Sequence, residues 1–224
     1  MKVAVVLTTY NRPNYLHQCL ESLKKVRWIP DSTIVIMDDM STDDLAIQLI
    51  KKFSIESISI HKWLNNQKYH IYGSLKNACD YAFNLKSDLV INLDADALAS
   101  PCFLEKAIEL HERFPNNICS LFNTLSCDHV TKLPRHPIIK DGEDYVIKHS
   151  IGGINMIFNK ELYQRFIRPN LVMYGWDWAM CESVKNNGEH FVVSKLSYVD
   201  HIGYISSISS IHNMNPDVAV NFQN

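Results

Sequence analysis

Two carboxylates, Asp94 and Asp96, come directly after an apolar run at residues 90–93, where a buried strand is expected to end. Side chains one residue apart point the same way from an extended chain. Like charges at that distance destabilise each other unless a cation or several hydrogen-bond donors offset them. The pair is therefore either part of a polar turn or a set of oxygen ligands for a hard divalent cation. Spacing alone leaves both interpretations open.

A second polar stretch, TTYNRP at residues 8–13, follows the first apolar run of the chain. In one interpretation it is a loop in which Asn11 caps the next helix. In the other it binds a nucleotide, with the Tyr10 ring stacked on the base and the Arg12 guanidinium on a phosphate.

The stretch MYGWDW places Asp177 between Trp176 and Trp178. Aromatic rings around one carboxylate are typical of a sugar-binding wall beside a base, and burial against rings would raise the Asp177 pKa. The spacing by itself favours a different interpretation, a core aromatic cluster in which Asp177 caps the following helix.

The interpretation of three further residues, Asp38, Asp39 and His201, depends on the polar clusters near them. Asp38 and Asp39 end the second apolar run, where they either complement the dipole of the next helix or add charge to the same site. His201 follows a later apolar run, and a lone histidine is usually structural or exposed. It becomes a metal-ligand candidate only if Asp94 and Asp96 hold a cation.

The elements that must position these residues alternate along the first half of the chain. Strand patterns at residues 2–7, 33–37, 57–61 and 88–93 alternate with helical patterns at 14–26, 41–52, 73–84 and 100–114. Such alternation predicts an α/β fold with a mostly parallel central sheet flanked by helices. Ligands bind such sheets beyond the carboxyl ends of the strands. Three polar clusters fall at those ends, namely residues 8–12, the pair Asp38 and Asp39, and the pair Asp94 and Asp96. The second half is less regular, with a long polar excursion at 126–144.

Composition narrows the class of protein. The 224 residues carry a net charge of −2, which gives no general attraction to nucleic acid or anionic membranes. The six cysteines form no C-x-x-C pair, so we expect no zinc site. No apolar stretch approaches the ~20 residues of a membrane span, and the N-terminus lacks a signal-peptide pattern. We therefore expect a cytoplasmic protein with reduced thiols.

Several segments, taken in chain order, resemble the family 2 glycosyltransferases of the GT-A fold. The matching segments are VAVVLTTYNRPNYLHQCLESL, IVIMDDMSTDD, GSLKNACDYAF, VINLDADALASPCFLEKAI, IGGINMIFNKELY and YGWDWAMCE. Together they extend over about residues 2–203. Each motif is loose alone, but their shared order makes the resemblance fairly specific.

The resemblance implies a role for each candidate residue. The residues implied to bind a nucleotide-sugar donor are Thr8, Tyr10, Arg12, Asp39, Lys76, Asp94, Gly152 and Gly153. Asp96 would bind Mn²⁺ or Mg²⁺, with His201 as a further ligand and Asp94 facing the ribose or the metal. Asp177 would be the catalytic base, and Trp176 and Trp178 would bind the acceptor. Many members carry a Glu-Asp pair at the base, whereas here Asp177 stands alone between tryptophans.

The sequence therefore predicts a metal-dependent, inverting glycosyltransferase, a hexosyl- or pentosyltransferase whose donor is by resemblance UDP-linked. The acceptor hydroxyl could belong to a glycan, a lipid-linked sugar, a protein or a modified nucleobase. One alternative is a phage-type enzyme acting on hydroxymethylated DNA bases, with phosphates bound by Lys132, Arg135, Lys140 and Lys148. Another is a non-catalytic nucleotide-sugar-binding module. Nucleotidyl transfer is disfavoured because residues 8–13 contain no glycine.

We expect one domain over residues 1–224, with two functional halves. About residues 1–100 would bind the nucleotide sugar, and about 101–203 would form the acceptor side. Residues 204–224 would be a tail or a lid.

Overall fold

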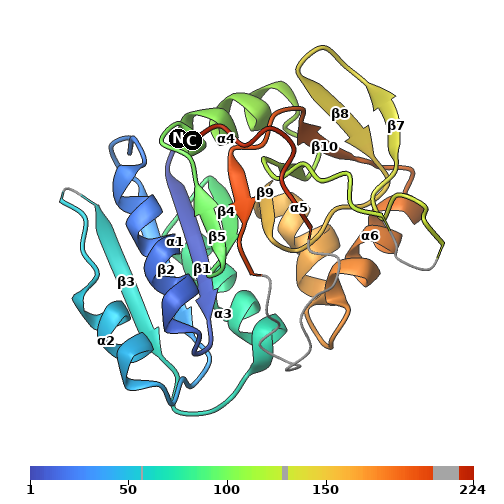
Figure 1. The fold of residues 1–224 in the computed structure, drawn as a ribbon. Helices are drawn as coiled ribbons and strands as arrows, with labels where there is room; N and C mark the ends of the chain where they lie inside the picture. Colours follow the sequence, from blue (N-terminus) through green and yellow to red (C-terminus); the bar gives the residue numbers. More distant parts are fainter. Residues whose placement is uncertain (57, 128–130, 204–216) are drawn as a thin grey trace.

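A computed structural model describes residues 1–56, 58–127, 131–203 and 217–224. Its centre is a twisted sheet with helices on both faces (Figure 1). The first half contains β1 (Val3–Thr9), α1 (Pro13–Lys25), β2 (Thr33–Asp38), α2 (Asp44–Lys52), β3 (Ser59–Leu64), α3 (His70–Asn84), β4 (Leu89–Asp94), β5 (Ala97–Ala99) and α4 (Phe103–Arg113). The predicted alternation of strands and helices in this half is confirmed.

The second half consists of shorter elements. They are β6 (Cys119–Ser120), β7 (Ile138–Asp141), β8 (Tyr145–Lys148), β9 (Asn155–Asn159), α5 (Lys160–Leu162), the π-helix η1 (Tyr163–Ile167), the 3-10 helix η2 (Arg168–Asn170), α6 (Trp176–Asn186), β10 (Phe191–Ser194) and β11 (Val199–His201). The predicted polar excursion at 126–144 thus contains a strand, β7. None of the described helices is long and apolar enough to cross a membrane.

The main sheet has nine strands in the order β3-β2-β1-β4-β9-β6-β10-β8-β7. Pairing is parallel from β3 to β4, as the sequence predicts for α/β units. Beyond β4 the sheet is mixed, because β9 inserts antiparallel between β4 and β6, and the β7–β8 hairpin adds a further antiparallel pair. The expected α/β class is confirmed, while the parallel character is confined mainly to the first half.

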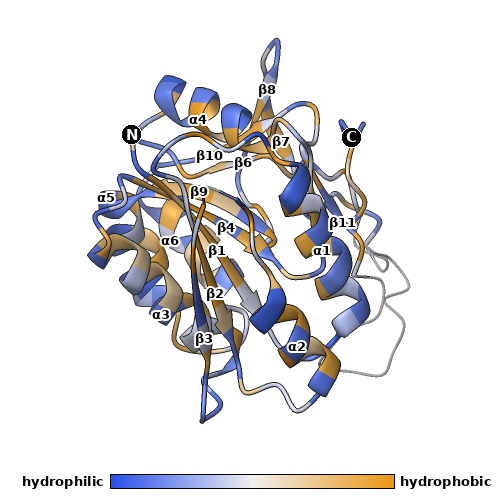
Figure 2. Ribbon diagram, turned by 90° about the vertical axis from the view of Figure 1, so that its left-hand side faces the viewer, coloured by the Kyte–Doolittle hydropathy of each residue, from blue (hydrophilic) through white to orange (hydrophobic). Residues whose placement is uncertain are grey.

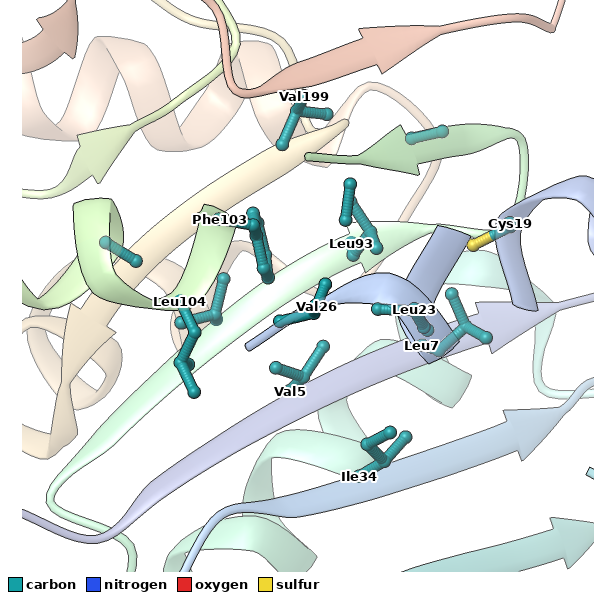
Figure 3. Close-up of a cluster of buried hydrophobic side chains, with 14 of the residues drawn as sticks. Val5, Leu7, Cys19, Leu23, Val26, Ile34, Leu93, Phe103, Leu104 and Val199 are labelled. Carbon is teal, nitrogen blue, oxygen red and sulfur yellow. The ribbon is translucent and has the colours of Figure 1, made fainter. Parts of the chain in front are cut away.

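Alternate residues of the central strands face two separate hydrophobic cores. On β1, Val3, Val5 and Leu7 face the core that is covered by α1, α2 and α4, whereas Ala4 and Val6 face the core covered by α3 and α6. Figure 2 shows apolar strands between the two helix layers, and Figure 3 shows the side chains of the first core. A strand buried on both faces is nearly continuous in hydrophobicity, as these runs are.

The helix boundaries follow from local capping chemistry. Pro13 occupies the first turn of α1, where its missing N–H costs nothing. The Asp43 side chain caps α2 by accepting hydrogen bonds from the N–H groups of Leu45 and Ala46. These caps fix where each helix begins after its strand, and so fix the loops that carry the polar clusters.

The predicted lid falls largely on residues 204–216, which lie outside the described residues. The last eight residues, 217–224, pack against the acceptor-side half. Ala219 forms an isolated antiparallel β-bridge with Thr124, and the Val220 N–H donates a hydrogen bond to the Asn123 carbonyl at 2.8 Å. This end of the chain is therefore attached to the fold by backbone contacts.

Candidate active site

The carboxyl ends of β1, β2 and β4 meet at one edge of the sheet. Thr8 pairs with Asp94, and Thr9 pairs with Asp38. A pocket of about 550 Å³ opens there. Of the residues predicted from the sequence, the pocket is lined by Thr8, Tyr10, Arg12, Asp39, Asp94, Asp96 and His201. Parallel pairing thus gathers clusters that are far apart in the sequence.

The acidic centre of the pocket is built by two short strands. Because β11 pairs antiparallel with β5, His201 lies opposite Ala97, next to Asp96. His201 Nε2 is 3.5 Å from Asp96 Oδ2, and Arg12 Nη1 is 2.6 Å from the same oxygen. A side chain at Gly203 would collide with Asp96, because its Cβ would overlap Oδ2 of that carboxylate. Asp96 is thus enclosed by an imidazole, a guanidinium and a glycine.

The two aspartates differ in their electrostatic environment. Burial, reinforced by the Asp96 charge, raises the pKa of Asp94 well above its ordinary value. Burial also acts to raise the pKa of Asp96, but the hydrogen bond from His201 and the charges of His201 and Arg12 outweigh it and lower that pKa. The same contact with Asp96 outweighs burial at His201 and raises its pKa. Arg12 and His201 thus stabilise the ionised form of Asp96, whereas burial and the Asp96 charge disfavour the ionised form of Asp94.

The donor atoms at this centre suit a divalent cation. Two carboxylates and an imidazole are ligands that Mn²⁺ and Mg²⁺ sites use. His201 Nδ1 is buried, with no hydrogen-bond partner among the described residues. Those residues contain no preformed group of three or more ligands, and Arg12 occupies one oxygen of Asp96. The residue types therefore fit a metal, although the ligands are not already in place around one.

The first loop is held in an unusual backbone conformation. Asn11 and Arg12 have φ values of 53° and 55°, the left-handed region that few residues adopt. Asn11 does not cap α1; its Oδ1 accepts from the N–H groups of Thr42 and Asp43 instead, at 2.9 and 3.0 Å. These hydrogen bonds join the loop after β1 to the loop after β2, and in this loop conformation Arg12 reaches Asp96.

The nucleotide side of the pocket is organised by Asp39. Its Oδ1 accepts from the Tyr69 N–H at 2.7 Å and from Ser74 Oγ at 3.0 Å, so it fixes the start of α3. The Tyr10 ring makes a cation–π contact with Lys68, whose Nζ lies 3.9 Å from the ring centroid. Lys68 lines the pocket, whereas Lys76, the lysine predicted from the sequence, is not among its lining residues. Lys68 lies in the loop before α3, and no sequence pattern marks it.

The predicted base, Asp177, lies in the first turn of α6, after Gly175. Burial raises the pKa of Asp177, and hydrogen bonds from the backbone N–H groups of Trp178, Asp177 and Gly153 offset part of that rise. A Cβ at Gly153 would lie 2.8 Å from the Trp176 ring, so that position requires glycine for packing. Gly152 lies on the same loop, and a Cβ there would approach His136 Nε2 at 4.0 Å.

The two tryptophans beside Asp177 have different environments. Trp176 is 6% exposed and packs in the core with Met180 and Val184, which share its helix face. Trp178 points the other way, is 50% exposed, and stacks on His136 with ring centroids 5.4 Å apart. Trp176 therefore belongs to the core, as the aromatic-cluster interpretation requires, but the N-cap of α6 is Gly175 and not Asp177. Of the two tryptophans predicted to bind the acceptor, Trp178 is the exposed one.

The acceptor side contains polar residues that sequence patterns did not single out. His136 Nδ1 is 2.9 Å from Ser150 Oγ, and burial lowers the His136 pKa to about 4. Asp217 lies 3.8 Å from Arg135 and interacts electrostatically with Asp177 and His201. The sequence that precedes Asp217 has no helical period, so no local sequence signal could have placed Asp217 here.

The four basic residues proposed for DNA phosphates do not form one accessible group. Lys132 and Lys140 are exposed, but Lys148 is 1% exposed and its Nζ donates to the Thr124 carbonyl at 2.8 Å. Arg135 is paired with Asp217. The assignment of Lys148 to phosphate contact is wrong, because alternation along β8 directs this side chain into the fold.

Burial of Lys148 predicts a pH-dependent stability. Burial lowers its pKa from 10.5 to about 8, with the Asp217 charge opposing the shift. Between these values the unfolded chain binds more protons, so the free energy of unfolding rises with pH. Between about pH 7.5 and about pH 10.5, we expect the free energy of urea unfolding of wild type to rise by up to about 3 kcal/mol relative to that of Lys148→Met. Lys140→Met, on the exposed neighbouring strand, should show no such trend; equal trends would contradict the assignment.

Comparison with known proteins agrees with this geometry. Residues 4–184 match the family described as glycosyl transferase family 2. The structure of S. aureus TarS 1–349 in complex with UDP-GlcNAc superposes with a TM-score of 0.63 at 16% identity, over 89% of this chain and 58% of that one. Its complex with UDP gives 0.59 at 16% identity, over 89% and 60%. This chain spans less than two thirds of TarS 1–349. The chain belongs to glycosyl transferase family 2 and has the GT-A fold.

Proposed function

We propose that this protein is a metal-dependent, inverting glycosyltransferase that moves a sugar from a UDP-linked donor to an acceptor hydroxyl. One observation carries the proposal: a single pocket joins the strand-end residues Asp39, Asp94 and Asp96 to His201, from the far end of the chain. Residues 1–224 would act as one domain, with about 1–100 holding the nucleotide and about 101–203 the acceptor side. Carboxylates gathered at such an edge suit a charged, phosphate-bearing ligand that arrives with a cation.

The donor would lie across the ends of β1 and β2. Thr8, Tyr10 and Asp39 would hold the nucleobase, with the second Asp39 oxygen available to accept from it while Oδ1 stays bonded to Tyr69 and Ser74. TarS has been solved with UDP and with UDP-GlcNAc, which supports UDP as the carrier. The sugar itself would extend toward α6.

Asp94, Asp96 and His201 would hold Mn²⁺ or Mg²⁺. Such an ion supplies charge neutralisation on the departing diphosphate, as a Lewis acid does. Arg12, now 2.6 Å from Asp96, would exchange that carboxylate for a phosphate oxygen of the donor. The positive charge of Arg12 thereby stays within the site in both states.

Asp177 would act as the general base. Its carboxylate would take the proton from the acceptor hydroxyl as that oxygen bonds to the anomeric carbon. The bond from that carbon to the diphosphate oxygen breaks on the opposite face, so the configuration inverts. A raised pKa strengthens the carboxylate as a proton acceptor. Trp178, exposed beside the base, would contact the acceptor.

The proposed chemistry accommodates several classes of acceptor. A hydroxyl on a glycan, a lipid-linked sugar, a protein or a modified nucleobase would each satisfy this chemistry. A duplex-DNA acceptor is less well supported, because Lys148 is buried and Arg135 is paired. A non-catalytic binding module would need the donor pocket but not a partly buried carboxylate beside it.

The proposal is tested by calorimetric titration of UDP-GlcNAc, UDP-glucose and UDP-galactose, with and without Mn²⁺, followed by measurement of UDP release with water as the acceptor of the sugar. Mn²⁺-dependent binding of one donor, with release of UDP, would support the enzyme. Donor binding without release under any condition would indicate the binding module. No binding of any donor would exclude the proposed function.

A further inference from the structure

A hydrogen bond links the nucleotide half to the base-bearing helix beside the donor pocket. Tyr174 Oη lies 2.9 Å from His70 Nδ1, and either group donates depending on the imidazole tautomer. His70 is the first residue of α3, and Tyr174 comes two residues before α6. Both residues line the pocket. Neither has a role in the reaction described above.

Three aromatic rings hold this link together. His70 stacks on Tyr72 with centroids 5.6 Å apart, and Tyr174 meets both rings edge-on at 5.6 and 5.7 Å. Tyr174 is 57% exposed, and its neighbours Val172 and Met173 are also exposed. This segment is therefore held by ring contacts and one hydrogen bond rather than by burial.

Each end of the link is attached to a residue of the proposed reaction. His70 has φ 58°, a left-handed conformation that is uncommon for histidine. That strained start of α3 is held by Asp39, whose Oδ1 accepts from Tyr69 and Ser74. At the other end, Gly175 has φ 76° and begins the turn that leads to Asp177, three residues after Tyr174.

We propose that the Tyr174–His70 hydrogen bond positions the start of α6, and with it Asp177, relative to a nucleotide bound at Asp39. This inference rests on the proposed function. A general base must lie within hydrogen-bond reach of the proton it takes, and a displacement of about 1 Å can cost about a hundredfold in rate. Tyr174 is a positioning residue in this scheme, acting on Asp177 through the chain.

The competing explanation is that the three rings merely stabilise the surface. If the rings only stabilise the surface, their loss would lower the melting temperature without changing the rate of the folded enzyme. Positioning of Asp177 would instead lower kcat while leaving nucleotide affinity almost unchanged. The two explanations therefore differ in which measured constant responds.

The test uses three variants of the full chain. Tyr174→Phe removes the hydroxyl and keeps the ring. Tyr72→Phe is the matched control, since Tyr72 belongs to the same ring cluster but does not line the pocket. His70→Asn keeps a hydrogen-bonding group near Nδ1 and tolerates positive φ. The readouts are kcat for UDP release from whichever of UDP-GlcNAc, UDP-glucose and UDP-galactose wild type turns over fastest, the Kd of UDP, and the melting temperature.

We expect Tyr174→Phe to lower kcat by about tenfold, the size of one well-placed hydrogen bond, with a change in UDP Kd below about twofold. Tyr72→Phe should stay within about twofold of wild type, and His70→Asn within about threefold. Equal kcat for Tyr174→Phe and Tyr72→Phe would overturn the inference. So would a loss of UDP affinity that matches the loss of rate, because Tyr174 would then be a donor contact. If wild type releases UDP from none of the donors, the proposed function itself fails.

Discussion

Asp177→Asn is expected to lower transfer by about 10²- to 10⁴-fold, the contribution typical of a positioned general base. Asparagine has nearly the same shape as aspartate but does not accept the acceptor proton. The first turn of α6 should remain, because the N-cap at Gly175 and the core contacts of Trp176 do not depend on the Asp177 charge. Initial rates of transfer or UDP release, with the Kd of UDP measured in parallel, check this expectation.

The matched control is Glu182→Gln on the same helix. Glu182 is exposed and only loosely paired with Lys185, at 3.9 Å. Its neutralisation should leave both rate and UDP affinity unchanged. If Asp177→Asn keeps the wild-type rate, Asp177 is not the base, and the proposed mechanism loses its proton acceptor. If Asp177→Asn loses UDP affinity together with rate, the carboxylate supports donor binding instead.

Asp96→Ala is expected to weaken Mn²⁺-dependent donor binding by at least about 100-fold, since even residues that only orient metal ligands typically cost 10- to 100-fold. Asp96 is the carboxylate on which both His201 and Arg12 converge. Its removal would deprive a bound cation of the proposed oxygen ligand and would take away the carboxylate partner of Arg12. Calorimetric titration of a UDP-sugar with and without Mn²⁺ measures the loss.

Two comparisons separate loss of the site from loss of the fold. Asp44→Ala removes an exposed carboxylate from the first turn of α2 and should keep Mn²⁺-dependent binding. The melting temperature of Asp96→Ala reports whether the variant still folds. A folded Asp96→Ala variant that binds donor with an unchanged response to Mn²⁺ would show that this carboxylate holds no metal. The aspartate pair would then be an ordinary polar turn.

The sequence by itself determined the first half of the sheet and the residues along its edge. Strands and helices that alternate at short spacing leave few topologies, and parallel pairing places every strand end on the same side. Thr8, Asp39 and Asp94 therefore had to lie near one another once their strands were recognised. The register that pairs Thr8 with Asp94 agrees with that expectation.

The tertiary structure decided what depends on contacts distant in sequence. The antiparallel insertion of β9 has no local signal, since periodicity does not encode the neighbour of a strand. His201 reaches Asp96 only through the pairing of β11 with β5. Packing also decides whether a lysine side chain is exposed to solvent. Lys148 is buried, for example, whereas Lys68 lines the pocket.

The stretch around Asp177 shows both contributions. Its composition indicated a carboxylate among aromatic rings, and the structure confirms that Asp177 is partly buried there. The start of α6 at Trp176 then directs Trp176 into the core and Trp178 outward. The hydrogen bond between Tyr174 and His70 spans 104 residues of sequence. Around Asp177, local pattern thus supplies the chemical groups, and long-range packing sets which of them face one another.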